Sequence, residues 1–306
     1  MPISIITKGK FNYFINNNLF FCKLKGNGLL AFTIAIPDSA VSDSSDIRAK
    51  TEKLFQFARI SAIYQVPDIL VYHDPFLKPE EAHRESRRIR RILEYIECPQ
   101  YLRKRLFPIS RDTSAVGVLS PLATPHHVLS KEIKPKEIRE AVIFLLQGRA
   151  VGDVGSVHLL DVINPPKFSL QEKVIRVTTQ IVSKDDKLKL RLLPNRPSDK
   201  YWGYKVHISK VTLSKALLNF KGVKIATSKT CESITSLNTK DLQNKDILVT
   251  FGSPYKGLPE MLKAEGKKIR DVFDHCINSL ANSGTRSLRL EEAMMITLSK
   301  LDILIK

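Results

Sequence analysis

The sequence predicts an α/β protein whose parallel sheet is interrupted by a small antiparallel β-barrel. Apolar, strand-like runs alternate with helical patterns before about residue 114 and again after residue 207, as is typical of a parallel sheet. Between these parts, five short β-like runs follow one another without a helical pattern, which favours a small barrel or sandwich. We therefore expect residues 1–130 and 208–306 to form two halves of one α/β domain, with a barrel inserted at 131–207.

The first half begins with an irregular or hairpin-like extension over residues 1–28, where turn formers separate apolar pairs. LLAFTIAIP at 29–37 has the profile of a strand buried on both faces. Asp46 or Ser45 can then cap a helix over about 47–65, and a second buried strand covers Ile69–His73. This strand–helix–strand unit predicts parallel pairing with a right-handed crossover.

The most basic part of the chain follows. In Glu80–Ile96 the apolar residues recur at helical spacing, and arginines occupy most of the other positions. PQYLRKRLFP at 99–108 then adds basic residues beside Tyr101 and Phe107, a combination that suits phosphate contact and base stacking. A solvated helix face is the alternative for any single arginine. The candidate RNA-binding residues are Arg87, Arg88, Arg91, Arg103, Lys104 and Arg105.

The barrel is predicted from the runs AVIFLLQ, SVHLLDVI, KVIRVTTQIVS, KLKLRLL and WGYKVHI. KLKLRLL alternates basic and apolar residues, so one of its faces could meet nucleic acid. Trp202 and Tyr204 are expected in the barrel core, with base stacking as the alternative. His126 and His127 have no partner ligands at metal-site spacing, so RNA contact or a structural turn is the expectation and no metal is predicted.

Strand–helix alternation resumes with a helix near 212–219 and strands at 222–227, 246–251 and about 272–277. Their carboxyl ends would line one edge of the sheet, where open parallel sheets bind ligands. At this edge, a loop of small polar residues after Ile277 leads into a helix from about Ser287. Free N–H groups at such a turn can hold the polar part of a nucleotide-like ligand. A solvated connection with a capped helix is the alternative.

Composition restricts the classes of partner and compartment. The 306 residues carry 49 Lys and Arg against 31 Asp and Glu, a net charge of +18, which favours nucleic acid as the partner. The four cysteines are scattered and are expected to be reduced thiols. The chain shows no apolar run of membrane-spanning length and no signal-peptide pattern, so we expect a cytoplasmic protein. A metabolic α/β enzyme with a nucleotide cofactor remains a rival, but no G-x-G-x-x-G or phosphate-loop motif supports it.

Several segments together resemble the SPOUT superfamily, the α/β-knot RNA methyltransferases that use S-adenosylmethionine. The resemblance is closest to the archaeal and eukaryotic branch with an inserted barrel of OB type, whose human member acts on large-subunit ribosomal RNA. It covers most of the chain, and PQYLRKRLFP and NSGTRSLRLEEA are its most specific motifs. The other segments that carry it are PDSAVSD (37–43), ARISAIYQVPDILVY (58–72), TPHH (124–127), YWGYKV (201–206) and FGSPYKGL (251–258).

The resemblance implies a trefoil knot that holds S-adenosylmethionine in three loops, and a homodimer. It also implies catalytic or charge-stabilising roles for Arg59, Arg286 and Arg289. The cofactor contacts that it implies are Thr227, Ser228, Phe251, Gly252, Ser253, Gly257, Ile277, Asn278, Gly284, Thr285, Ser287 and Leu288.

The predicted reaction is direct transfer of the sulfonium methyl to RNA, with a uridine ring nitrogen in ribosomal RNA as one acceptor. An arginine would stabilise the negative charge that develops on the base, because it stays protonated in proteins. Glu291 or Glu292 could serve as a base, but carboxylates in a first helical turn more often stabilise the helix dipole. A non-catalytic RNA-binding or ribosome-assembly factor that keeps the same fold is the alternative function.

Overall fold

The computed structural model describes residues 32–166, 168 and 174–305, so the expected extension at 1–28 lies outside the described residues. The described chain forms two compact units. One consists of residues 98–110 and 123–202, and the other of residues 32–97, 111–122 and 203–305. Below they are called the barrel unit and the sheet unit.

The sheet unit contains a six-stranded sheet in the order β11-β9-β10-β1-β2-β8, in which all neighbouring strands are parallel. The parallel sheet expected from the sequence is thereby confirmed. The strands are β1 (Phe32–Pro37), β2 (Asp68–His73), β8 (Lys205–Thr212), β9 (Val223–Ser233), β10 (Ile247–Thr250) and β11 (His275–Asn278). β1 and β10 are buried along their whole length, which explains why they read as continuous apolar runs.

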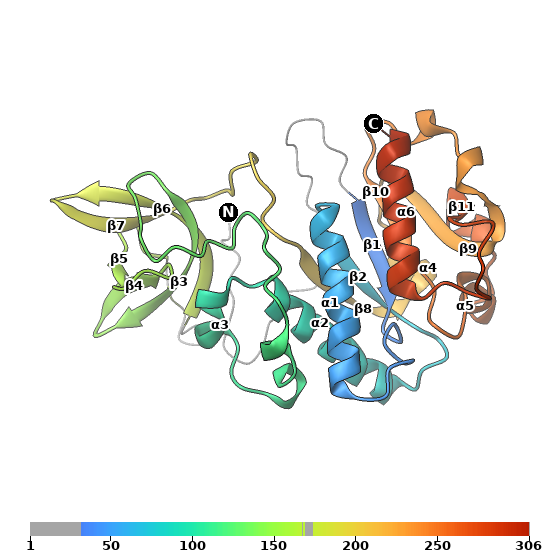
Figure 1. Ribbon diagram of the computed structural model, residues 1–306, viewed down its shortest axis with the longest axis horizontal. Helices are drawn as coiled ribbons and strands as arrows, with labels where there is room; N and C mark the ends of the chain where they lie inside the picture. The colour runs from blue at the N-terminus through green and yellow to red at the C-terminus, as the bar shows by residue number, and fades with distance from the viewer. Residues whose placement is uncertain (1–31, 167, 169–173, 306) are drawn as a thin grey trace. The chain divides into compact units, whose positions relative to one another are not determined.

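Long helices cover one face of this sheet. Helix α1 (Ile47–Ile63) begins at the expected cap, where the Asp46 carboxylate accepts a hydrogen bond from the Ala49 N–H at 2.9 Å. Figure 1 shows α1 and α6 (Leu290–Ile305) side by side against the sheet. These two helices and α2 (Pro79–Glu97) bury their apolar residues against the strands in one continuous core. On the other face, α4 (Leu213–Ala216) and α5 (Leu258–Ala264) contribute to a second core.

The barrel unit contains an antiparallel sheet in the order β5-β4-β3-β6-β7. A bridge between Val162 and Leu190 brings the two ends of this sheet together, so the sheet is nearly closed. Helix α3 (Gln100–Leu106) packs against β3 and β6. The strands are β3 (Ile138–Leu146), β4 (Arg149–Asp153), β5 (Leu160–Asp161), β6 (Val174–Lys184) and β7 (Lys187–Leu192). Short 3-10 helices, all in the sheet unit, occupy Arg111–Thr113, Val116–Val118, Ile234–Ser236, Thr239–Asp241 and Ile269–Asp271.

The assignment of WGYKVHI to the antiparallel barrel was wrong. Its residues from Lys205 onward form β8, which pairs in parallel with β2 at the edge of the other sheet. Tyr204 accordingly belongs to the core of the sheet unit, where its hydroxyl donates to the Leu93 carbonyl at 2.9 Å. Trp202 is buried in the barrel unit, with its indole N–H donating to the Pro197 carbonyl at 2.8 Å.

The cysteine prediction was also wrong in part. Cys231 and Cys276 form a disulfide, while Cys98 is a buried thiol. The two bonded cysteines lie on the neighbouring strands β9 and β11, with their Cα atoms 5.6 Å apart. Among the described residues, no helix has the length and apolar character needed to cross a bilayer.

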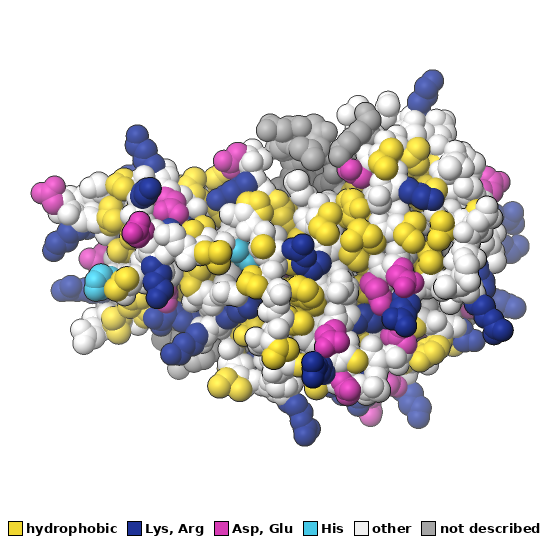
Figure 2. All heavy atoms as spheres, in the orientation of Figure 1, with side chains coloured by type: hydrophobic (Ala, Val, Ile, Leu, Met, Phe, Trp, Pro, Cys, Tyr) yellow, Lys and Arg dark blue, Asp and Glu magenta, His cyan; other side chains and the backbone are white. Residues whose placement is uncertain are grey.

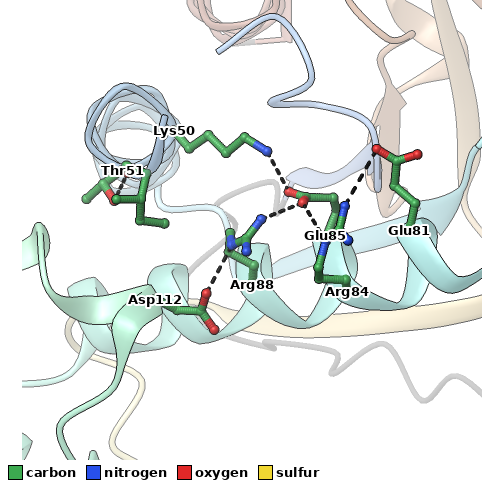
Figure 3. Close-up of polar contacts among 8 residues, drawn as sticks. Lys50, Thr51, Glu81, Arg84, Glu85, Arg88 and Asp112 are labelled. Carbon is green, nitrogen blue, oxygen red and sulfur yellow. Dashed lines mark hydrogen bonds and ion pairs between the residues drawn. The ribbon is translucent and has the colours of Figure 1, made fainter. Parts of the chain in front are cut away.

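A buried ion-pair network joins α1, α2 and the 3-10 turn at Arg111–Thr113 (Figure 3). The Glu85 carboxylate is almost fully buried and accepts hydrogen bonds from Lys50 at 3.0 Å and from Arg88. Arg88 also contacts Asp112 at 3.0 Å. Burial raises the pKa of Glu85, but Lys50 and Arg88 lower it by more, so its pKa lies below the ordinary 4.5.

We expect Glu85→Gln to destabilise the protein by roughly 1–3 kcal/mol at pH 7, because it removes the buried anion that Lys50 and Arg88 share. Since the folded-state pKa of Glu85 is lowered, its contribution is present above pH 4.5 and is lost as the pH falls from 4.5 through the folded-state pKa. Urea unfolding from pH 7 to pH 3 measures both effects. Glu81→Gln, at a half-exposed carboxylate 3.8 Å from Arg84, is the matched control and should change stability by less than about 0.5 kcal/mol.

Candidate functional site

Three turns lie at the carboxyl edge of the parallel sheet, where β9, β10 and β11 end side by side. The Thr227 hydroxyl donates to the Thr250 carbonyl at 2.9 Å and thereby ties the first turn to the second. The Asn278 amide donates to the Lys229 carbonyl at 3.1 Å and ties the third turn to the first. The structure therefore brings residues from all three predicted cofactor turns into one place.

The first turn is formed by an interruption in the pairing of β9 with β11. Cys276 pairs with Ala226, but the next residue, Ile277, pairs with Glu232. Residues 227–231 are therefore excluded from the ladder. Thr227 and Ser228 lie in this bulge, and the disulfide closes its far end at Cys231.

The second turn follows β10 and folds tightly on itself. Phe251 is buried, and its carbonyl accepts a hydrogen bond from the Tyr72 hydroxyl at 2.6 Å. The Ser253 N–H donates to the Lys256 carbonyl at 2.9 Å, which closes the turn. A Cβ on Gly252 would lie 3.0 Å from that same carbonyl, 3.1 Å from the Gly257 Cα and 3.2 Å from the Leu258 nitrogen. A Cβ at this position would therefore require these backbone atoms to shift by a few tenths of an ångström.

The third turn starts at the buried Ile277, and the chain is exposed over residues 281–287 before it reaches α6. Asn278 uses both ends of its side chain in the protein, because its carbonyl oxygen also accepts from the Leu280 N–H at 3.1 Å. Farther along, the Thr285 hydroxyl donates to the Ser287 carbonyl at 3.1 Å. Gly284, Thr285 and Ser287 are exposed and Leu288 is half-buried.

The two glutamates at the start of α6 have structural partners. Glu291 lies 3.4 Å from the buried amine of Lys53, which also contacts Asp43. Glu292 accepts the Arg289 N–H at 2.8 Å and so caps the first turn of α6. Both carboxylates therefore stabilise α6, and the side chains of Arg286 and Arg289 remain exposed beside them.

Arg59 lies apart from these turns. Helix α1 runs from the carboxyl end of β1 back toward the amino end of β2, and Arg59 is twelve residues beyond its first residue. At 1.5 Å per residue this is about 18 Å along the helix, away from the edge that holds the turns. Its guanidinium donates to the Leu122 carbonyl at 2.8 Å and holds the segment 111–122 against α1.

A polar cluster that was not identified from the sequence lies at the same edge, where β1 and β2 end. The His73 Nδ1 is 3.0 Å from a carboxylate oxygen of Asp38, and the other oxygen of Asp38 accepts the Asp74 N–H at 2.9 Å. The Ser39 hydroxyl donates to Asp74. Burial raises the pKa of the Asp38 carboxyl, although its hydrogen bonds with Asp74 and His73 counteract the effect. A single histidine at the end of a strand carries no sequence signal by itself.

The second turn folds closely around Gly252 and presents its main chain at the carboxyl edge of the sheet. Backbone N–H and C=O groups of this kind can fix the orientation of a small ligand. Thr227 uses its hydroxyl to hold the Thr250 carbonyl, so its contribution is to position the neighbouring turn.

The candidate RNA-binding residues divide between the two units. Arg87 of α2 is exposed, whereas Arg88 belongs to the ion-pair network of Glu85 and Arg91 is half-buried. In α3, Arg105 lies 2.6 Å from Asp153 and its guanidinium stacks 4.4 Å from the Phe144 ring centre. Arg103 donates to the Cys98 carbonyl, and Lys104 is exposed. Figure 2 shows further Lys and Arg side chains on both units, with acidic side chains among them.

His126 is buried in the barrel unit, 3.9 Å from the carboxylate of Glu140. Glu140 is fully buried and is also paired with Arg176 and, at 2.5 Å, with Arg196. This burial agrees with a structural role for His126, which was one of the two expectations.

Comparison with known proteins connects this architecture to one family. A family model described as "Putative RNA methyltransferase" matches residues 31–301. The chain is 28% identical over 301 residues to the 28S rRNA (uridine-N(3))-methyltransferase of Drosophila melanogaster, covering 88% of the chain and 61% of that relative. It is 27% identical over 306 residues to the human protein of the same name, covering 88% of the chain and 77% of the relative. An uncharacterized protein of Halobacterium salinarum is 27% identical over 291 residues, with 89% of the chain and 98% of that protein covered.

Proposed function

The chain belongs to the RNA methyltransferase family whose model spans residues 31–301, and we propose from this membership that it methylates a uridine ring nitrogen in ribosomal RNA. The observation that carries the proposal is that the family match includes the whole parallel sheet and the three turns at its carboxyl edge. The acceptor follows from the relatives, two of which are named for the N3 atom of uridine in 28S rRNA. The net charge of +18 suits a polyanionic substrate.

The methyl donor in this proposal is S-adenosylmethionine, held by the three turns. The main chain of Phe251–Gly257 and the bulge at Thr227–Ser228 would contact the adenosine part, and residues 284–288 would close over it. The donor supplies a methyl group bound to a positively charged sulfur, which keeps the bonding electron pair when the methyl leaves. The protein's part is to align the acceptor nitrogen with that bond, which can contribute roughly 7–11 kcal/mol.

We include three finer features of the family in the proposal: a trefoil knot, an OB-type barrel and a homodimer. The knot is supported by the strand order, because the last strand β11 lies beside β9 and the chain then returns to α6 next to α1. The OB-type barrel is supported by the five-stranded antiparallel sheet, which is nearly closed. Exposed apolar residues on α6, Met295 and Ile303, are consistent with a second copy against this helix.

Arg286 and Arg289 are the arginines that we assign to stabilising charge on the acceptor base, since both are exposed next to the third turn. Arg59 enters the proposal as the residue that positions the segment 111–122 through Leu122. A direct role for Arg59 would require RNA or a second protomer to reach its position on α1.

Incubating the protein with methyl-labelled S-adenosylmethionine and undermethylated ribosomal RNA should yield 3-methyluridine, detected by nucleoside mass spectrometry. Arg289→Ala should lower kcat by about 10²-fold through lost charge stabilisation, while Arg48→Ala, at an exposed arginine of α1, serves as the control. Tight RNA binding by the wild-type protein without any methyl transfer would instead support the non-catalytic RNA-binding function.

Gly252→Ala should weaken binding of S-adenosylmethionine by about tenfold or more, equivalent to about 1.4 kcal/mol. The added methyl would press on three backbone atoms of the second turn within 3.2 Å and displace the turn. Titration calorimetry measures the affinity directly. Gly117→Ala is the matched control, because a Cβ there meets no atom within 4 Å. Equal affinity in the two variants would remove the second turn from the proposed donor site.

RNA affinity should fall with salt, with a log–log slope of about −0.7 for each phosphate neutralised on a single strand. Arg87→Ala and Lys104→Ala should each make the slope less negative by about 0.7, because both side chains are exposed cations in the candidate set. Lys263→Ala on α5 is a control that should leave the slope unchanged. Fluorescence anisotropy over a salt series gives these slopes, and identical slopes in all variants would exclude the two residues from the RNA contact.

A further inference from the structure

The Asp38–His73 pair at the ends of β1 and β2 joins a buried carboxylate to a partly exposed imidazole ring. Asp38 is only 3% exposed and lies 3.0 Å from the His73 Nδ1, whereas the His73 ring reaches the surface with its side chain 24% exposed. Because the carboxylate accepts from Nδ1–H, it fixes the neutral ring with its proton on Nδ1. The other nitrogen, Nε2, is then available to accept a proton.

The pair lies next to the candidate donor site. β1 is hydrogen-bonded to β2 on one side and to β10 on the other, so Asp38 and His73 end at the same edge as Phe251. The Tyr72 hydroxyl donates to the Phe251 carbonyl at 2.6 Å. In addition, the Lys256 amine lies 5.5 Å from the Phe76 ring centre, so the segment after β2 contacts the second turn.

Methylation at a uridine ring nitrogen requires a group that takes up a proton. The N3 atom carries a hydrogen, which must leave if N3 is to use its electron pair for the new bond to carbon. Arginines cannot accept it, because they stay protonated. Glu291 is paired with Lys53, and Glu292 caps α6, so neither carboxylate is placed for this task.

We propose that His73 accepts the N3 proton of the acceptor base at Nε2, with Asp38 as the positioning residue that holds its ring. This inference rests on the proposed function. The N3–H bond breaks and the proton moves to Nε2. The electron pair left on N3 forms the bond to the methyl carbon, while the methyl–sulfur bond of the donor breaks and its electron pair stays on sulfur. The imidazolium that results is stabilised by the buried carboxylate of Asp38, and its proton passes to water after the reaction.

The surroundings of His73 favour this role. Asp74 is the other acidic group of the cluster, but its oxygens are occupied by the Ser39 hydroxyl and the Phe76 N–H. On β8, the residue paired with His73 is the uncharged Thr212. Among the described residues, Asp38 is the charged group that forms a hydrogen bond or ion pair with the His73 ring. Uptake of a proton by the ring would give the buried Asp38 carboxylate a cationic partner, which offsets the cost of its burial.

Single-turnover kinetics across pH 5 to 9 test the role of His73. We expect His73→Gln to lower the rate by about 10²- to 10⁴-fold, the usual contribution of a general base, and to abolish the decline of the rate on the acid side. RNA affinity should stay within about twofold of the wild-type value. Asp38→Asn should lower the rate by about 10²-fold or more, because it no longer fixes the ring. His83→Gln, at an exposed histidine of α2, is the matched control.

A second measurement does not depend on catalysis. Nitrogen-15 spectra of the ring in the free wild-type protein should show the His73 proton on Nδ1 and a bare Nε2, and Asp38→Asn should lose this preference. A wild-type ring with its proton on Nε2 would overturn the inference, and so would an unchanged rate and pH profile in folded His73→Gln. If the wild-type protein transfers no methyl group, the proposed function fails and the inference fails with it. Transfer that does not depend on His73 leaves the function standing and removes only the inference.

Discussion

Parallel pairing of β1, β2, β9, β10 and β11 is the constraint on which the candidate site depends. In a parallel sheet every strand ends at the same edge, so turns that are far apart in the sequence must meet there. Thr227, Phe251 and Asn278 come together for this reason, and so do Asp38 and His73. No further structural element is needed to bring these residues together, because the register of the buried strands already places them at one edge.

Each turn is held by contacts that use up the polar groups of the residues that define it. The side chains of Thr227 and Asn278 donate hydrogen bonds to neighbouring carbonyl groups, and Ser253 closes its own turn with Lys256. These residues therefore shape the edge, while the main chain between them is what a ligand can contact. The disulfide reinforces the same arrangement, because it joins β9 and β11 at the point where their pairing is interrupted.

Sequence patterns predicted the helices and strands, but not every pairing of strands or cysteines. α2 was predicted because its apolar residues recur at helical spacing, and the two central strands because they are continuous apolar runs. α1 was predicted from its capping residue between two strands. β8 was assigned to the wrong sheet because a short alternating run fits any half-buried strand, and its partner β2 lies far back in the sequence. The disulfide was missed for a similar reason: its cysteines are 45 residues apart, and only the pairing of β9 with β11 brings them together.

The position of Arg59 could have been deduced from the sequence. Once the first strand, helix and strand are taken as a parallel crossover, the helix must run back toward the amino ends of the strands. A residue three turns into that helix then lies far from the carboxyl edge, whatever family motif it matches. The same argument places the residues directly after β1 and β2 at that edge, as the structure shows for Asp38 and His73. The direction of the chain in each strand and helix therefore shows which residues can lie in one site. A match to a sequence motif alone does not show this.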